Sequence, residues 1–201
     1  SFSVPMAPQK MMVRHGSLFL SHRMTNFDFN LYEFSLEGTR IGEYENVSGL
    51  EEDKAATTAV VDQSGSIVSA GYFAPFIKKY SREGKLVASG TFEPKIANKM
   101  SPLQLTSSYQ AGRLRIEGSE HPIVLDIAVD RAGHIFLLVA RDHKEEERTG
   151  LLRLDSSLRI MDDVDLPFFC SRIYIDEEDS FYFLSRRRTK CLVRCRAEYL
   201  E

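Results

Sequence analysis

The stretch AVVDQSGSIVSAGYFAPFIKKYSREGKLVASG, residues 59–90, contains two β-hairpin patterns in succession. In each pattern a short apolar run precedes a turn that ends in glycine, Gly65 in the first and Gly84 in the second. Asp62 opens the first turn, where its carboxylate can cap the turn's own amides, and glycine accepts a positive φ at the last position. We therefore expect four short antiparallel strands joined as a meander.

This unit recurs along the chain. We call the last residue of each first turn the anchor of its unit. The anchors are Gly16 in HGSLFL, Gly65 in SGSIVS, Gly133 in AGHIFL and Asp179 in EDSFYF. In the last three units an aspartate stands three residues before the anchor, in AVVDQSG, IAVDRAG and IYIDEED. The second hairpins, LYEFSLEGTRI, IKKYSREGKLV, LLRLDSSLRIM and LVRCRAEYLE, share a column of charged residues, which consists of Glu33, Lys79, Arg153 and Arg194.

Four such units predict an all-β protein, a β-propeller made of four-stranded antiparallel blades. A β-sandwich also has short strands with regular turns, but it does not require the same chemistry to recur in register. We expect one domain over residues 1–201, with blades near 9–46, 55–93, 123–166 and 168–201. Residues 94–122 are either an insertion or a degenerate blade, and residues 2–4 could supply the outer strand of the fourth blade.

The units resemble the repeats of NHL-type, six-bladed β-propellers of the TolB-like group. Those blades follow the pattern hydrophobic, Asp, x, x, Gly, x, Ile, and then Ile, x, Lys, Phe, Asp, x, x, Gly, Lys. The resemblance is closest in residues 59–90 and 124–155, and the chain departs from it at Val13 and Asp179. Six blades need roughly 240 residues, so the resemblance implies a small propeller or part of a six-bladed ring.

Composition excludes several classes of protein. The 201 residues include 26 Lys and Arg against 29 Asp and Glu, a formal net charge of −3, which argues against a nucleic-acid partner. No apolar run is long enough for a membrane span, and three cysteines do not form a disulfide framework for a chain of this size. The first residue is Ser1 rather than Met. This favours a secreted or periplasmic protein whose leader has been removed.

Four polar residues precede the anchors by seven positions. Because inner strands line the axis of a propeller, we expect these residues to form a ring at the mouth of its channel. A polar ring is also what any water-filled channel would show. The four are Gln9, Thr58, Asp126 and Arg172.

Connections between the second and third strands should lie on the same face as this ring. They are rich in aromatic and charged residues, and recognition usually resides in such loops. The charged tips at 145–147 and 186–188 could equally be solvated loop ends. The binding candidates in these connections are Phe27, Tyr72, Phe73, Arg141, His143, Arg186 and Arg187.

The sequence contains no GxSxG elbow, HExxH motif, P-loop or GxGxxG fingerprint. We therefore predict a non-enzymatic binding scaffold without a cofactor that recognises a protein, peptide or glycan, as the resemblance implies most often. The alternative is a metal-dependent hydrolase, lactonase or lyase like some propeller relatives, with calcium or zinc in the channel. Asp126 and His121 would be its ligands, and Arg172 would be an unfavourable neighbour for a cation.

Overall fold

The computed structural model describes residues 10–21, 29–45, 57–72, 75–92, 106–110, 113–117, 123–141, 148–185 and 191–196. The regular structure of these residues is entirely β, and none of them forms a helix that could cross a membrane. Blade 1 comprises β1 (Lys10–Arg14), β2 (Ser17–Ser21), β3 (Phe29–Ser35) and β4 (Arg40–Glu45). Blade 2 comprises β5 (Thr57–Val61), β6 (Ile67–Gly71), β7 (Phe76–Tyr80) and β8 (Leu86–Thr91).

Two further sheets complete the set. Blade 3 comprises β11 (Val124–Val129), β12 (Ile135–Ala140), β13 (Thr149–Leu154) and β14 (Ile160–Asp165). Blade 4 has three described strands, β15 (Arg172–Ile175), β16 (Ser180–Ser185) and β17 (Cys191–Arg196). All pairings within these sheets are antiparallel between consecutive strands. The predicted β-propeller of antiparallel meander blades is therefore confirmed.

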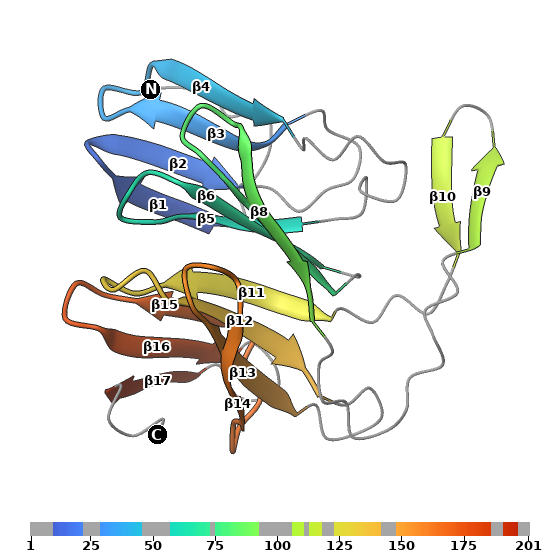
Figure 1. Cartoon of the computed structure of the whole chain (residues 1–201), viewed down its shortest axis with the longest axis vertical. Helices are drawn as coiled ribbons and strands as arrows, with labels where there is room; N and C mark the ends of the chain where they lie inside the picture. The colour runs from blue at the N-terminus through green and yellow to red at the C-terminus, as the bar shows by residue number, and fades with distance from the viewer. Residues whose placement is uncertain are drawn as a thin grey trace.

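The inner strands of the four blades are neighbours in chain order. β5 contacts both β1 and β11, and β11 in turn contacts β15. Figure 1 shows the blades following one another in this order, from the blue blade 1 to the red blade 4. The structure describes four blades, so the six-bladed count and the NHL subtype remain predictions. Residues 2–4, the expected outer strand of blade 4, lie outside the described residues.

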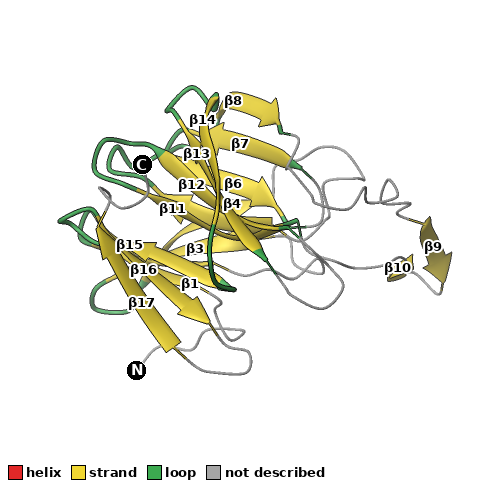
Figure 2. Cartoon of the chain, turned by 90° about the horizontal axis from the view of Figure 1, so that it is seen from below, coloured by secondary structure: helices red, strands yellow, loops and turns green. Residues whose placement is uncertain are grey.

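A separate hairpin lies within the segment predicted to be an insertion or a degenerate blade. It consists of β9 (Thr106–Gln110) and β10 (Arg113–Glu117), which pair only with each other in the described part of the chain. Figures 1 and 2 both show this hairpin standing away from the four blades.

The first turns of blades 2 to 4 have the predicted chemistry. The carboxylate of Asp62 accepts hydrogen bonds from the backbone N–H groups of Ser64 and Ser66 at 2.8 and 2.9 Å. Gly65 closes that turn with a φ of 83°. Asp179 takes the same left-handed conformation in blade 4, with a φ of 55°. An aspartate can replace glycine there because Asp tolerates the left-handed region better than most residues.

Apolar residues fill the spaces between neighbouring blades. One cluster joins blades 2 and 3 and includes Val68, Ile127 and Leu137, and another joins blades 3 and 4. Every residue of β11 is buried, since this strand has a neighbouring blade on each side. In β1, by contrast, Lys10, Met12 and Arg14 are half-buried while the alternate residues are exposed.

Candidate functional site

The hydrogen-bond register identifies the residues at equivalent positions of the four inner strands. Thr58, Asp126 and Arg172 each pair with the residue five positions after their anchor. In blade 1 the residue in that position is Lys10, which pairs with Ser21. The predicted ring position therefore contains lysine in blade 1. Gln9, the residue predicted there, lies outside the described residues.

A shorter turn explains the shift by one residue. Blade 1 turns through His15 and Gly16 alone, and both have positive φ, 50° and 73°. This is the pattern of a two-residue type I′ hairpin. Blades 2 to 4 have three residues in the same turn because their opening aspartate pairs with the residue after the anchor. Val13 in place of the opening aspartate was the signal in the sequence that blade 1 turns differently.

Lys10, Thr58 and Asp126 come together, and we call these three residues the axial cluster. The Lys10 ammonium lies 3.1 Å from Asp126 Oδ1 and also donates to the backbone carbonyls of Ile127 and Ile173. Asp126 Oδ2 accepts a hydrogen bond from Ile173 N at 3.0 Å. The Thr58 hydroxyl lies 3.5 Å from Asp126 Oδ1. Three blades thus contribute side chains to one hydrogen-bonded cluster, and blade 4 contributes backbone.

The axial cluster is buried and electrically balanced. Asp126 is 2% exposed, and the side chain of Lys10 is 13% exposed. A buried charge is tolerated when it is paired and hydrogen-bonded, as both charges are here. A register shift in β11 between Val124 and Asp126 accompanies this arrangement, and such bulges commonly redirect a side chain.

Arg172 occupies the equivalent position of the inner strand in blade 4, but its side chain has a different hydrogen-bond partner. Its guanidinium donates to the carbonyl of Ser171 at 2.9 Å, and no hydrogen bond joins it to Asp126 among the described residues. The structure therefore places Arg172 beside the axial cluster rather than within it.

Two of the predicted loop candidates are described. The Tyr72 carbonyl accepts hydrogen bonds from the backbone N–H groups of Ile123 and Val124, which joins the end of β6 to the start of β11. Arg141 is buried and forms ion pairs with Asp163 and Asp165. Burial lowers the pKa of Arg141, and Asp165 opposes that shift. The other loop candidates, Phe27, Phe73, His143, Arg186 and Arg187, lie outside the described residues.

A metal site is not evident in the described part of the chain. No group of three or more His, Cys, Asp or Glu side chains gathers there in a way that could hold an ion. Asp126, the predicted ligand, is bound to Lys10 instead. His121, the second predicted ligand, lies outside the described residues.

The fold defines the chain as a β-propeller, and comparison with solved structures agrees. A structure described as streptogramin B lyase aligns with 94% of this chain at 15% identity and a TM-score of 0.53, over 54% of its own length. A member of the DUF4221 family from Bacteroides vulgatus aligns with 93% at 10% identity, with a TM-score of 0.49 and 63% of its own length. Virginiamycin B lyase from Staphylococcus aureus aligns with 94% at 12% identity, with a TM-score of 0.43 and 69% of its own length.

The similarity to the streptogramin B lyase structure, at 15% identity, shows the fold alone. This chain spans about half the length of the streptogramin B lyase structure that it matches. No family model matches the sequence, and no curated protein matches it.

Proposed function

We propose that this propeller is a non-enzymatic binding scaffold that recognises a protein, peptide or glycan through the connections between the second and third strands. The partners of Asp126 favour this proposal over a metal-dependent enzyme. Asp126 is the one carboxylate of the axial cluster, and Lys10, Thr58 and Ile173 N already engage it. A divalent cation needs several converging oxygen or nitrogen ligands. At Asp126 it would have to displace an ammonium group.

Metal analysis separates the scaffold from the metal-dependent alternative. Purified protein should contain less than a tenth of an equivalent of calcium or zinc, and Asp126→Asn should not change that content. A stoichiometric metal that is lost in Asp126→Asn but retained in the control variant Asp165→Asn would overturn the scaffold proposal. Asp165 is a suitable control because its side chain is 77% exposed and lies outside the axial cluster.

Binding is tested directly on glycan and peptide arrays. The wild-type protein should retain at least one glycan or peptide class, and a Tyr72→Ala, Phe73→Ala double variant should bind it at least tenfold more weakly. Met161→Ala is the matched control, because Met161 is an exposed apolar residue of the outer strand β14. Equal loss in the control, or full binding by the double variant, would contradict recognition through the predicted connection.

A further inference from the structure

A hollow lies at the end of the axis where the first turns of the blades meet. Its volume is about 610 Å³, within the range of small-molecule sites. All four blades contribute to its lining through these turns or the strand ends beside them. The lining residues are Val13, Arg14, His15, Gln63, Arg131 and Glu177. The inner strands begin at the opposite face, so this hollow is separate from the surface in the proposed function.

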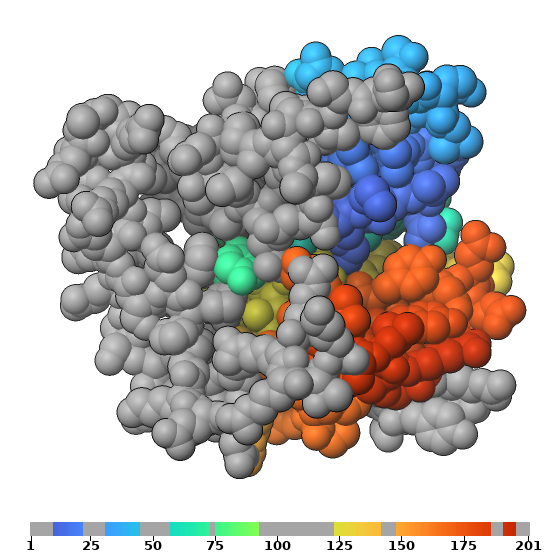
Figure 3. All heavy atoms as spheres, turned by 180° about the vertical axis from the view of Figure 1, so that it is seen from behind, coloured from blue at the N-terminus to red at the C-terminus, as the bar shows by residue number. Residues whose placement is uncertain are grey.

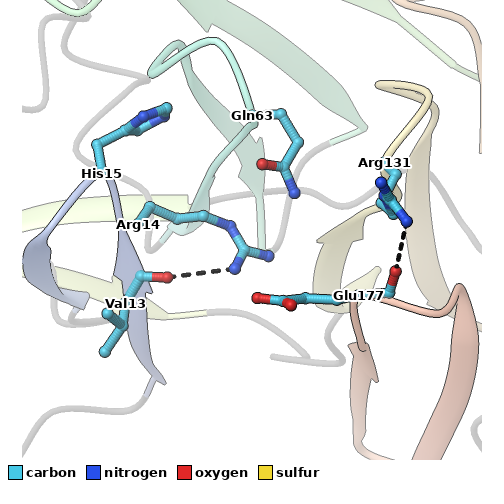
Figure 4. A pocket seen from close by; sticks show the side chains of 6 residues that line it. All are labelled: Val13, Arg14, His15, Gln63, Arg131 and Glu177. Carbon is cyan, nitrogen blue, oxygen red and sulfur yellow. Dashed lines mark hydrogen bonds between the residues drawn. The ribbon is translucent and has the colours of Figure 1, made fainter.

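Two arginines dominate the chemistry of the hollow. Figure 4 shows the Arg14 side chain extending between Gln63 and Glu177, with Arg131 on the far side. Arg14 Nη1 donates to the carbonyl of Val13 at 3.2 Å, while its Nε is buried without an acceptor among the described residues. Arg131 Nη1 donates to the Glu177 carbonyl at 3.1 Å. Neither guanidinium forms an ion pair with a carboxylate in the described part of the chain.

The turns hold these groups in place. The backbone N–H of Arg131 donates to Asp179 Oδ1 at 3.1 Å, so the first turns of blades 3 and 4 are joined beside the hollow. In blade 1 the type I′ turn begins directly after Arg14 and fixes where β1 ends. A guanidinium offers five donors in a planar fork that matches a carboxylate. Arg14, at the end of β1, and Arg131, in the first turn of blade 3, therefore present their donors from backbone that is itself held in place.

We propose that the hollow binds a small organic carboxylate. Arg14 and Arg131 would receive the carboxylate, and Glu177 and Gln63 would accept hydrogen bonds from hydroxyl groups of the same molecule. The charge of the lining sets the ligand class. Its two arginines outnumber its one glutamate by a single positive charge, which suits a monoanion better than a polyphosphate. The Glu177 carboxylate would repel additional negative charge.

Isothermal titration with matched sugars tests this proposal. Glucuronate and glucose share a ring and differ by the carboxylate, so the wild-type protein should bind glucuronate at least tenfold more tightly than glucose. Arg14→Gln and Arg131→Gln should each weaken glucuronate binding at least tenfold. Arg159→Gln is the matched control, because Arg159 is an exposed arginine of the outer turn in blade 3 and should leave binding unchanged.

A second ligand and a second variant test the charge argument. Inorganic phosphate should bind the wild-type protein more weakly than glucuronate, and Glu177→Gln should tighten phosphate binding severalfold by removing the repulsive carboxylate. The thermal midpoint of each variant shows that it is folded. If neither glucuronate nor acetate binds at 10 mM, or if glucuronate binding survives both arginine substitutions in a folded protein, the proposal is wrong.

Discussion

Gly150 has no room for a side chain, because the side chain of Arg141 occupies the space where a Cβ would lie. A Cβ added there would overlap the guanidinium of Arg141, which lies buried against the Gly150 backbone. Forcing extra volume into a packed site costs typically 1–3 kcal/mol. We expect Gly150→Ala to lower the free energy of unfolding by about 2 kcal/mol in urea titrations.

Gly90 provides the control for this substitution. It also lies in a strand, but the nearest atom to an added Cβ is 3.8 Å away, an ordinary contact distance. Gly90→Ala should therefore change the free energy of unfolding by about 0.5 kcal/mol or less. Equal losses in the two variants would show that Arg141 can move aside at little cost.

Lys10 and Asp126 should contribute to the free energy of unfolding as a pair, so that removing one charge destabilises the fold by leaving the other unpaired. Lys10→Met leaves a buried carboxylate without its cation, and Asp126→Leu leaves the ammonium without its anion. Each single variant should lose about 3 kcal/mol of unfolding free energy, because a remaining buried charge is uncompensated. The double variant should lose less than the sum of the two, by about 1 kcal/mol or more.

The partly exposed pair Arg153 and Asp162, 3.4 Å apart, is the comparison for this cycle. Its coupling should be about 0.5 kcal/mol, since water screens it. A coupling between Lys10 and Asp126 no larger than this would remove the axial cluster as a source of stability. Denaturant titration of all variants at one pH measures both couplings.

Sequence reasoning identified Thr58 and Asp126 at the axis but missed Lys10. The reason is physical: the two-residue turn of blade 1 contains one residue fewer than the turns in the other blades, so counting seven residues back from the anchor goes one residue too far, to Gln9. Asp126, Ile127 and Ile173, which the Lys10 ammonium contacts, are separated from it by 116 residues or more along the chain. No local pattern indicates contacts of that kind.

At the scale of single elements, the first turns make the protein sensitive to acid. Burial raises the pKa of Asp62, but hydrogen bonds from Ser64 and Ser66 and the ion pair with Lys79 outweigh it, and the pKa lies below its ordinary value. The pKa of Asp176 is also lowered, chiefly by the hydrogen bond from the Ser180 backbone. A carboxyl with a lowered pKa in the folded state stabilises the fold above its unfolded pKa.

The sign of the pH effect follows from this direction of shift. Stability contributed by Asp62 is complete near neutral pH and declines as the pH falls below about 4, where the unfolded chain takes up protons more readily. Asp62→Asn should therefore be less stable than the wild type at pH 7, and the gap should narrow by pH 3. Urea midpoints at the two pH values measure it. A constant gap would mean that the ionised form of Asp62 contributes nothing.

The charged column predicted from the second hairpins is a real column in three dimensions. Glu33, Lys79, Arg153 and Arg194 each pair with the residue three positions after the anchor of their blade. The repeat could be predicted because strand alternation and turn length place like residues in like positions. The column is basic in the three blades whose first turn opens with aspartate, and Lys79 pairs with Asp62 in blade 2.

Blade 1 lacks the opening aspartate, and its column residue is the acidic Glu33. The cation for Glu33 comes from the neighbouring blade, since Arg82 Nη2 lies 3.3 Å from its carboxylate. Tyr44 donates to Glu33 at 2.6 Å, and burial together with this bond raises the pKa of Tyr44 to about 12. A contact between blades, such as that of Arg82 with Glu33, could not be predicted from the repeat, because the repeat describes one blade at a time.

At the scale of the whole molecule, the blades are unequally packed against one another. Blade 3 has an apolar cluster on each of its faces, one shared with blade 2 and one with blade 4. Figure 3 shows blade 1 in blue beside blade 4 in orange and red. The Lys10 ammonium in blade 1 donates a hydrogen bond to the Ile173 carbonyl in blade 4. Met11 and Tyr174, in the inner strands of these two blades, are 66% and 53% exposed. Blades 1 and 4 therefore have the least buried apolar surface on their inner strands.

Local opening should begin where the least apolar surface is buried. Amide hydrogen exchange followed by mass spectrometry should show faster exchange in β1 and β15 than in β11, whose residues are all buried. Lys10→Met should accelerate exchange in β1 and β15 further and leave β7 unchanged, because β7 is the third strand of blade 2 and contains no residue of the axial cluster. Exchange that is uniform across the four inner strands would instead mean that the propeller opens as one cooperative unit, with the contact between Lys10 and Ile173 contributing nothing separate.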